Sequence, residues 1–211
     1  MKTALRALML GGLVAAALAF AGCSKGPSAA AIGEEMTLGE AKAPVTIIEY
    51  ASVTCAHCAE FHKDVMPQLM SKYVATGKVR IVYREFLTPP HDVAAAGTLT
   101  ARCAGKDKYF KVTDAIMRAQ AEMFAGGSTE NARPVLQRIA KDVGGLNADQ
   151  FAKCVTDPES LATLQANVEK FREQDKITGT PTFFINGKQL HRTSGDIGDF
   201  DRALAPLLAG K

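Results

Sequence analysis

The sequence predicts an α/β fold in which two strand-containing segments flank a long helical block. Apolar, β-rich runs occupy residues 45–51 and 78–86, and the next such run appears only at residues 182–185. Between them, residues 92–176 show helical patterns interrupted by Gly-rich breaks. A strand–helix–strand half, a helical block, and a hairpin followed by a helix therefore succeed one another along the chain.

The first half begins with a buried strand at residues 45–51. A helix is expected from Cys55 to about Val74, and Pro67 inside it predicts a kink because proline lacks the N–H of the helical hydrogen bond. Residues 78–86 alternate between apolar and polar side chains, which predicts a strand. We expect this strand to lie parallel to the first, since a right-handed helical crossover joins them.

Capping residues and turn residues mark the later elements. Asn147, with Gln150 in the capping-box position, and the dipeptide Asp157-Pro158 each predict the start of a helix. Asn186-Gly187 is a strong hairpin signal and should follow the strand at 182–185. A short second strand and a terminal helix at about residues 197–208 complete the predicted fold.

The segment Cys55-Ala56-His57-Cys58 lies where the first strand gives way to the first helix. Two cysteines separated by two residues can close a small disulfide ring. The first sulfur would lie at a helix N-terminus, where unpaired amides and the helix dipole favour a thiolate. A readily ionised thiol attacks and leaves quickly in disulfide exchange. The segment therefore predicts a redox site.

A zinc site is the alternative interpretation of Cys55 and Cys58. It requires two further ligands, and the sequence holds no second C-x-x-C or H-x-x-x-H to supply them. His62, His91 and His191 are expected on the surface or on helix faces rather than as ligands. We therefore predict no metal.

The N-terminus predicts export. Lys2 and Arg6 precede an apolar stretch that is short for a membrane span, which is typical of a signal peptide over residues 1–22. Phe20-Ala21-Gly22-Cys23 resembles a bacterial lipoprotein box, so Cys23 is expected to carry a lipid anchor on an extracytoplasmic membrane surface. The alternative is ordinary cleavage after Ala19-Phe20-Ala21, which would leave Cys23 as a spare thiol. Residues 23–40 are expected to form a flexible tether.

The remaining cysteines, Cys103 and Cys154, lie far apart in two helical patterns. In an oxidising compartment they are expected to form a structural disulfide between two helices. The alternative is two unrelated buried thiols.

The formal net charge is +3, and the basic residues form no run and are not interleaved with aromatic side chains. A nucleic-acid partner is therefore not expected.

Taken together, these features resemble the exported thiol-disulfide oxidoreductases of the DsbA family, within the thioredoxin superfamily. The C-x-H-C motif, Glu49 six residues before Cys55, Gly179-Thr180-Pro181-Thr182 ahead of a β run, and the position of the helical block all match. The family often has proline where this chain has Ala56. The resemblance implies a thioredoxin fold at residues 41–89 and 177–211 with an inserted helical domain at residues 90–176.

The resemblance also implies roles for individual residues. Cys55 would be the exposed nucleophile and Cys58 the buried partner, with His57 influencing the thiolate. Glu49 would lie beneath the disulfide and relay protons to or from Cys58; otherwise it simply points outward from its strand.

On the other side of the cysteines, the resemblance implies a cis Thr180-Pro181 bond that leaves the Thr180 backbone free for an extended substrate, and a hydrogen bond from Thr180 to a cysteine sulfur. A simple turn proline is the alternative for Pro181, and a surface histidine without a role is the alternative for His57.

The function implied is that of an exported dithiol oxidase that introduces disulfide bonds into reduced or unfolded exported proteins. The resemblance also implies that a DsbB-type quinone-linked membrane partner reoxidises the two cysteines. No metal or organic cofactor is expected. A disulfide reductase or isomerase on the same fold is the main alternative. A binding or chaperone module with structural cysteines is the alternative from another class. The short tether leaves no room for an oligomerisation module, so a monomer is expected.

Overall fold

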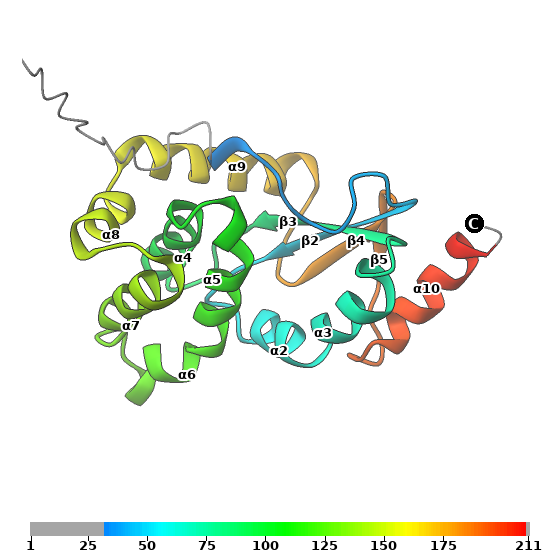
Figure 1. The fold of residues 1–211 in the computed structure, drawn as a ribbon, viewed down its shortest axis with the longest axis horizontal. Coiled ribbons are helices and arrows are strands. Elements are labelled where there is room, and N and C mark those ends of the chain that lie inside the picture. Colours follow the sequence, from blue (N-terminus) through cyan, green and yellow to red (C-terminus); the bar gives the residue numbers. More distant parts are fainter. Residues whose placement is uncertain (1–31, 210–211) are drawn as a thin grey trace, which may run out of the picture.

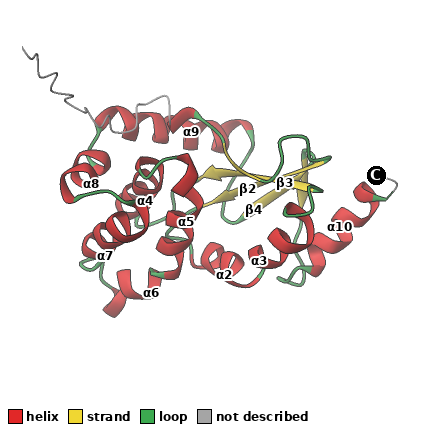
Figure 2. Cartoon of the chain, in the orientation of Figure 1, coloured by secondary structure: helices red, strands yellow, loops and turns green. Residues whose placement is uncertain are grey.

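The computed structural model describes residues 32–209 and organises them around one five-stranded sheet (Figure 1; Figure 2). The strand order is β1-β3-β2-β4-β5. The inner strands β2 (Val45–Ala51) and β3 (Val79–Glu85) are parallel. The strands β1 (Met36–Leu38), β4 (Thr182–Ile185) and β5 (Lys188–Leu190) pair antiparallel with their neighbours.

The predicted order of elements is confirmed. A β2–helix–β3 half comes first, helices follow, and β4, β5 and α10 (Gly198–Leu208) close the chain. The hairpin turn between β4 and β5 is formed by Asn186 and Gly187, which both have positive φ angles. Asn147 forms the predicted capping box with Gln150, and the Asp157 side chain accepts a hydrogen bond from the Ser160 amide.

The helix predicted from Cys55 to Val74 is divided into three pieces. These are α2 (Ala56–Asp64), α3 (Met66–Leu69) and the π-helical segment η1 (Met70–Val74). The break falls at Val65, because Pro67 occupies the first turn of α3, where its missing N–H is not needed. Phe61, Val65 and Leu69 are buried, so the kink keeps one apolar face against the sheet.

Helices cover both faces of the sheet. On one face Ile47, Ile81 and Phe183 pack with Phe61 of α2 and Phe200 of α10. On the other face Tyr50 and Phe184 pack with side chains of the long helix α9 (Pro158–Gln174), which lies across the top of the view in Figure 1.

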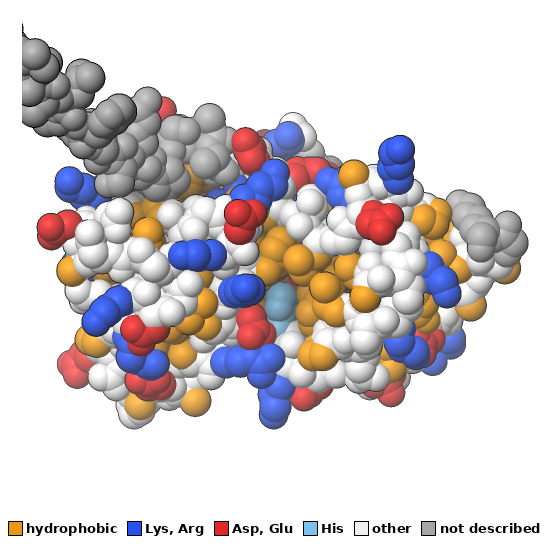
Figure 3. Space-filling model, in the orientation of Figure 1, with side chains coloured by type: hydrophobic (Ala, Val, Ile, Leu, Met, Phe, Trp, Pro, Cys, Tyr) orange, Lys and Arg blue, Asp and Glu red, His pale blue; other side chains and the backbone are white. Residues whose placement is uncertain are grey.

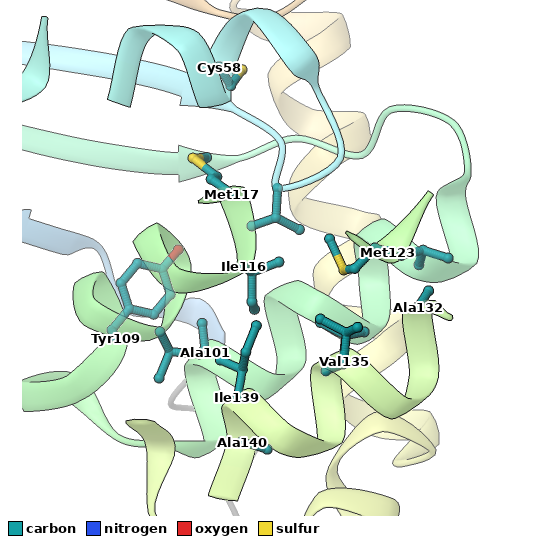
Figure 4. Packing of buried hydrophobic residues seen from close by; sticks show 14 of the residues in the cluster. Cys58, Ala101, Tyr109, Ile116, Met117, Met123, Ala132, Val135, Ile139 and Ala140 are labelled. Atoms are coloured by element: carbon teal, nitrogen blue, oxygen red, sulfur yellow. The ribbon is translucent and has the colours of Figure 1, made fainter. Parts of the chain in front are cut away.

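The helical block forms its own core beside the sheet. Its helices are α4 (His91–Cys103), α5 (Lys106–Arg118), α6 (Gln120–Met123), η2 (Ala125–Gly127), α7 (Ala132–Ile139), η3 (Ala140–Gly144) and α8 (Ala148–Val155). Figure 4 shows Ile116, Met117 and Met123 packed with Val135 and Ile139, with Cys58 of α2 at the edge of the same cluster. The core of the block is therefore continuous with the environment of Cys58.

The tether prediction is wrong for part of its range. Residues 36–38, expected to be flexible, form β1 and pair with β3 in the register Met36↔Tyr83. Ile32 and Met36 are buried, at 1% and 3% exposure. Burial of these two side chains against the sheet and α9 outweighs the polar, Gly-containing character of the segment. The predicted signal peptide, Cys23 and residues 23–31 of the tether lie outside the described residues.

The surface carries charges of both signs. On the face shown in Figure 3, acidic and basic side chains are interspersed over the helical block, and hydrophobic side chains gather beside it. Within residues 32–209, no helix combines the length and the apolar character needed to cross a bilayer.

Candidate active site

The two cysteines of the C-x-x-C segment differ in exposure. Cys55 is the N-cap residue of α2, in extended conformation with φ −79° and ψ 119°, and its side chain is partly exposed. Cys58 lies one turn into the helix and is fully buried. Both are free thiols in this structure. A reagent or substrate can therefore reach the sulfur of Cys55 but not that of Cys58.

The surroundings of Cys55 favour its thiolate and lower the pKa of its thiol to about 5. The largest cause is the hydrogen bond from the Cys58 thiol. The Thr180 hydroxyl and the backbone N–H groups of Cys58 and His57 also lower the pKa, and partial burial opposes them. These amides belong to the first turn of α2, so the helix N-terminus contributes as its sequence position predicts.

Cys58 shows the opposite behaviour. Burial, followed by the hydrogen bond to and the charge of Cys55, raises the pKa of the Cys58 thiol far above its ordinary range. Met117 belongs to the same hydrophobic cluster as Cys58 (Figure 4), and the charge of Cys58 also reaches the Tyr83 hydroxyl. The pair therefore holds one thiolate, on the exposed sulfur, and one proton, on the buried sulfur.

The Thr180–Pro181 segment lies directly against Cys55. The peptide bond between the two residues is cis, and the protonated form of Cys55 donates a hydrogen bond to the Thr180 carbonyl oxygen over 3.3 Å. The Thr180 hydroxyl is buried and has no other hydrogen-bond partner among the described protein atoms. It is thus free to donate to the sulfur when Cys55 ionises.

Gln120 of α6 fixes the loop that leads into Cys55. Its side-chain amide donates to the backbone carbonyls of Val53 and Cys55, at 2.8 and 3.1 Å. The loop is also tied to the segment before α4, because the Thr54 hydroxyl donates to the Thr88 carbonyl at 3.0 Å. The sequence does not indicate a role for Gln120, since nothing in the local pattern around residue 120 points to a site 65 residues earlier.

The His57 side chain points into solvent. It is 80% exposed and its Nδ1 lies 3.2 Å from the Glu60 carboxylate. Its backbone N–H contributes to the thiolate environment, whereas a role for its imidazole stays a prediction.

Glu49 is buried rather than pointing outward. It is 0% exposed on β2, and its Oε1 lies 2.9 Å from Nε2 of His62. Of the two positions expected for His62, the surface or a helix face, the structure shows the second: the residue lies on the buried face of α2 and is 6% exposed. His62 follows Cys58 by four residues, and this helical spacing was the signal that it shares the buried face of α2. His91 and His191 are exposed, as expected.

Cys103 and Cys154 are joined by a disulfide, with a Cα–Cα distance of 6.3 Å. It links the last residue of α4 to α8 and is separate from the Cys55–Cys58 pair. Within residues 32–209, no cluster of three or more His, Cys, Asp and Glu side chains is arranged to hold a metal ion.

The site thus combines a partly exposed sulfur at a helix N-terminus, a buried partner thiol and a cis-proline segment beside them, which is the geometry that disulfide exchange requires. A model of the thioredoxin family matches residues 31–204, and the chain belongs to that family.

Comparison with known proteins agrees with this class. The chain is 35% identical over 162 residues to a protein of Rickettsia prowazekii named as a candidate protein-disulfide oxidoreductase. That match covers 77% of this chain and spans 58% of the length of the relative. It also resembles the crystal structure of Wolbachia pipientis α-DsbA1, with 26% identity, a TM-score of 0.72, and coverage of 83% of this chain and 91% of that one.

BdbD from Bacillus subtilis shares the fold at a TM-score of 0.73, with 16% identity and coverage of 88% of this chain and 97% of BdbD. The predicted thioredoxin fold with a helical insertion, and the resemblance to DsbA-like proteins, are confirmed by these matches.

Proposed function

We propose that this protein is a thiol-disulfide oxidoreductase that works as a dithiol oxidase, passing the Cys55–Cys58 disulfide to reduced exported proteins. The observation that carries the proposal is the stabilised thiolate of Cys55, whose pKa is lowered to about 5. A stabilised thiolate belongs only to the reduced form. It therefore makes reduction of the disulfide more favourable and the disulfide a better oxidant.

The size of this effect follows from the pKa. At pH 7 a thiol with a pKa of about 5 gains about 2.7 kcal/mol from ionisation, at about 1.4 kcal/mol for each pH unit. For a two-electron couple this corresponds to a potential higher by about 60 mV. Because Cys55 is partly exposed and solvent screens its interactions, we take this value as an upper bound.

The reaction runs through one mixed disulfide. A substrate thiolate attacks Sγ of Cys55, and the Cys55–Cys58 bond breaks with its electron pair moving to Cys58, which takes up a proton. A second substrate thiolate then attacks the substrate sulfur of the mixed disulfide and releases Cys55 as a thiolate. Two substrate thiols become one disulfide, and the protein gains the two electrons and keeps one proton on Cys58.

An open groove that includes His57 and Pro181, the neighbours of the cysteines, offers a place for the substrate chain. It is lined by Pro181, by Phe61 and Val65, and by residues 192–195. The loop at residues 193–195 is held by the buried Asp199, which accepts hydrogen bonds from all three backbone amides of that loop. An extended peptide could add to the Thr180 backbone and lay its side chains in this groove.

Cell location and partners belong to the same proposal. A disulfide donor requires an oxidising compartment, which agrees with the export signal predicted at residues 1–22. Lipidation of Cys23 would hold the domain at a membrane surface, and a DsbB-type membrane protein would reoxidise Cys55 and Cys58. We also propose the domain division that the family resemblance implies, with a thioredoxin fold at residues 41–89 and 177–211 and a helical domain at residues 90–176. A monomer is proposed because the tether is short.

The reduction potential of Cys55–Cys58 tests the direction of the reaction. The full-length protein is equilibrated in glutathione buffers, and mass spectrometry identifies which cysteines change state. A potential well above about −200 mV supports the oxidase. A value near or below about −270 mV would instead identify a reductase and refute the proposal. A Cys55→Ser, Cys58→Ser variant that keeps full activity would identify a binding module.

A further inference from the structure

A buried acid–base pair lies beneath the active-site helix. Glu49 of β2 and His62 of α2 approach to 2.9 Å between Oε1 and Nε2. Their side chains are 1% and 6% exposed, so solvent water screens the interaction little. Burial at this depth disfavours a charged imidazole, and the neighbouring Glu49 side chain offsets that cost for His62.

The groups around His62 make Glu49 its dominant partner. Tyr83 of β3 stacks edge-on at 6.0 Å between ring centroids, and Phe61 contacts the imidazole from the same helix. From α5, the charges of Asp114 and Arg118 reach the imidazole with opposite effects. These two residues form an ion pair with each other at 2.7 Å and are about half exposed.

The electrostatic balance at His62 favours its protonated form. Burial by itself lowers the pKa of the imidazole, but the charge and the hydrogen bond of Glu49 outweigh it, and the pKa of His62 is raised. The pair therefore keeps its shared proton, across the 2.9 Å contact, to a higher pH than a free histidine would.

Glu49 also acts on the buried sulfur. The Glu49 charge is among the causes that raise the pKa of Cys58. The second carboxylate oxygen, Oε2, and the Tyr83 hydroxyl are buried and lack a hydrogen-bond partner among the described protein atoms. Glu49 thus has one oxygen committed to His62 and one oxygen available to exchange a proton.

We propose that His62 is a positioning residue that stores the proton which Glu49 passes to and from Cys58 during disulfide exchange. The inference rests on the proposed function and adds a proton donor to it. When the disulfide is opened, the Cys58 thiolate takes a proton from the pair, leaving Glu49 as a carboxylate and His62 neutral. When Cys58 attacks a mixed disulfide at reoxidation, its proton returns to the pair and His62 becomes an imidazolium again.

The experiment follows the two steps of reoxidation separately. Reduced full-length protein is mixed with glutathione disulfide, and mass spectrometry of acid-quenched samples measures the mixed disulfide at Cys55 and its resolution by Cys58. His62→Gln keeps a hydrogen-bond donor for Glu49 but cannot carry a proton. We expect resolution to slow about tenfold at neutral pH, with mixed-disulfide formation unchanged and the inflection in the pH profile of resolution lost.

Two controls separate proton storage from packing. His191→Gln removes an exposed imidazole and should leave both steps unchanged, whereas His62→Lys restores a cation and should recover part of the resolution rate. Equal slowing of both steps in His62→Gln, or an unchanged pH profile, would show that His62 only packs against Phe61 and Tyr83 and would overturn the inference.

A measurement on the unmutated protein guards against a variant that does not fold. The titration of the His62 imidazole is followed by NMR in the oxidised and the reduced protein, and the inference requires different midpoints in the two states. Identical midpoints would overturn it. The outcome is independent of the reduction potential, because a reductase with a low potential must also protonate and deprotonate Cys58.

Discussion

Replacing Thr180 by valine tests how the protein stabilises its reactive thiolate. The Thr180 hydroxyl is buried beside Cys55, lacks another partner and lowers the pKa of the Cys55 thiol. Valine has nearly the same shape but no donor. The variant therefore removes one hydrogen bond to a charged sulfur and keeps the packing around Pro181.

The expected magnitude follows from the strength of that bond. A hydrogen bond to a charged group contributes about 1.5–3 kcal/mol. Because Cys55 is partly exposed, we take the lower end of this range, which corresponds to a rise of about one in the pKa of Cys55. The same free energy lowers the reduction potential of the Cys55–Cys58 pair by about 30 mV.

The assay is the ultraviolet absorbance of the thiolate in reduced protein, titrated with pH and corrected with oxidised protein. Thr180→Ser keeps the hydroxyl and should titrate like the unmutated chain. The reasoning is refuted if Thr180→Val leaves the pKa of Cys55 unchanged. It is also refuted if the pKa rises while the potential, measured in glutathione buffers, stays the same.

Two further predictions concern stability. The pKa of Cys55 falls from an ordinary 9.0 to about 5 on folding of the reduced protein. The thiolate's contribution to the stability of the reduced protein is thus complete above pH 9 and disappears as the pH falls through about 5. As the pH is raised from 5 to 9, the melting temperature of the reduced form should therefore rise relative to that of the oxidised form. Parallel curves of melting temperature against pH for the two forms would contradict this. Replacing both Cys103 and Cys154 by serine opens a loop spanning 51 residues and should lower the free energy of unfolding by up to about 4 kcal/mol in chemical denaturation. The thiolate titration of Cys55 should not change in that variant, and an unaltered denaturation midpoint would show that the cross-link adds nothing.

Much of this fold could be predicted because its strands and helices carry strong local patterns. The run at residues 45–51 pairs with β3 as expected, and Asn186-Gly187 forms the hairpin turn. The strand β1 could not be predicted, since three residues are too few to show alternation. It exists because the edge of β3 offers free backbone partners to Met36–Leu38.

The site could be predicted in part for the same physical reason. Cys55 and Cys58 lie next to each other along one helix, so sequence spacing alone determines their relation. His62 was predictable in principle from its spacing to Cys58, but its partner Glu49 comes from another element. Gln120 was not predictable, because its contacts with Val53 and Cys55 depend on how α6 lies against the loop between β2 and α2.

The docking of α6 has a consequence for the size of the protein. The Gln120 amide is the side-chain donor to the two backbone carbonyls at the entrance to α2, and Met117 of α5 shares the hydrophobic cluster of Cys58. A shortened chain made only of the sheet and its flanking helices would lose this donor and would let water reach the second sulfur. The helical block therefore forms part of the active-site environment. The environment of the two cysteines thus depends on residues that lie outside the sheet and its flanking helices.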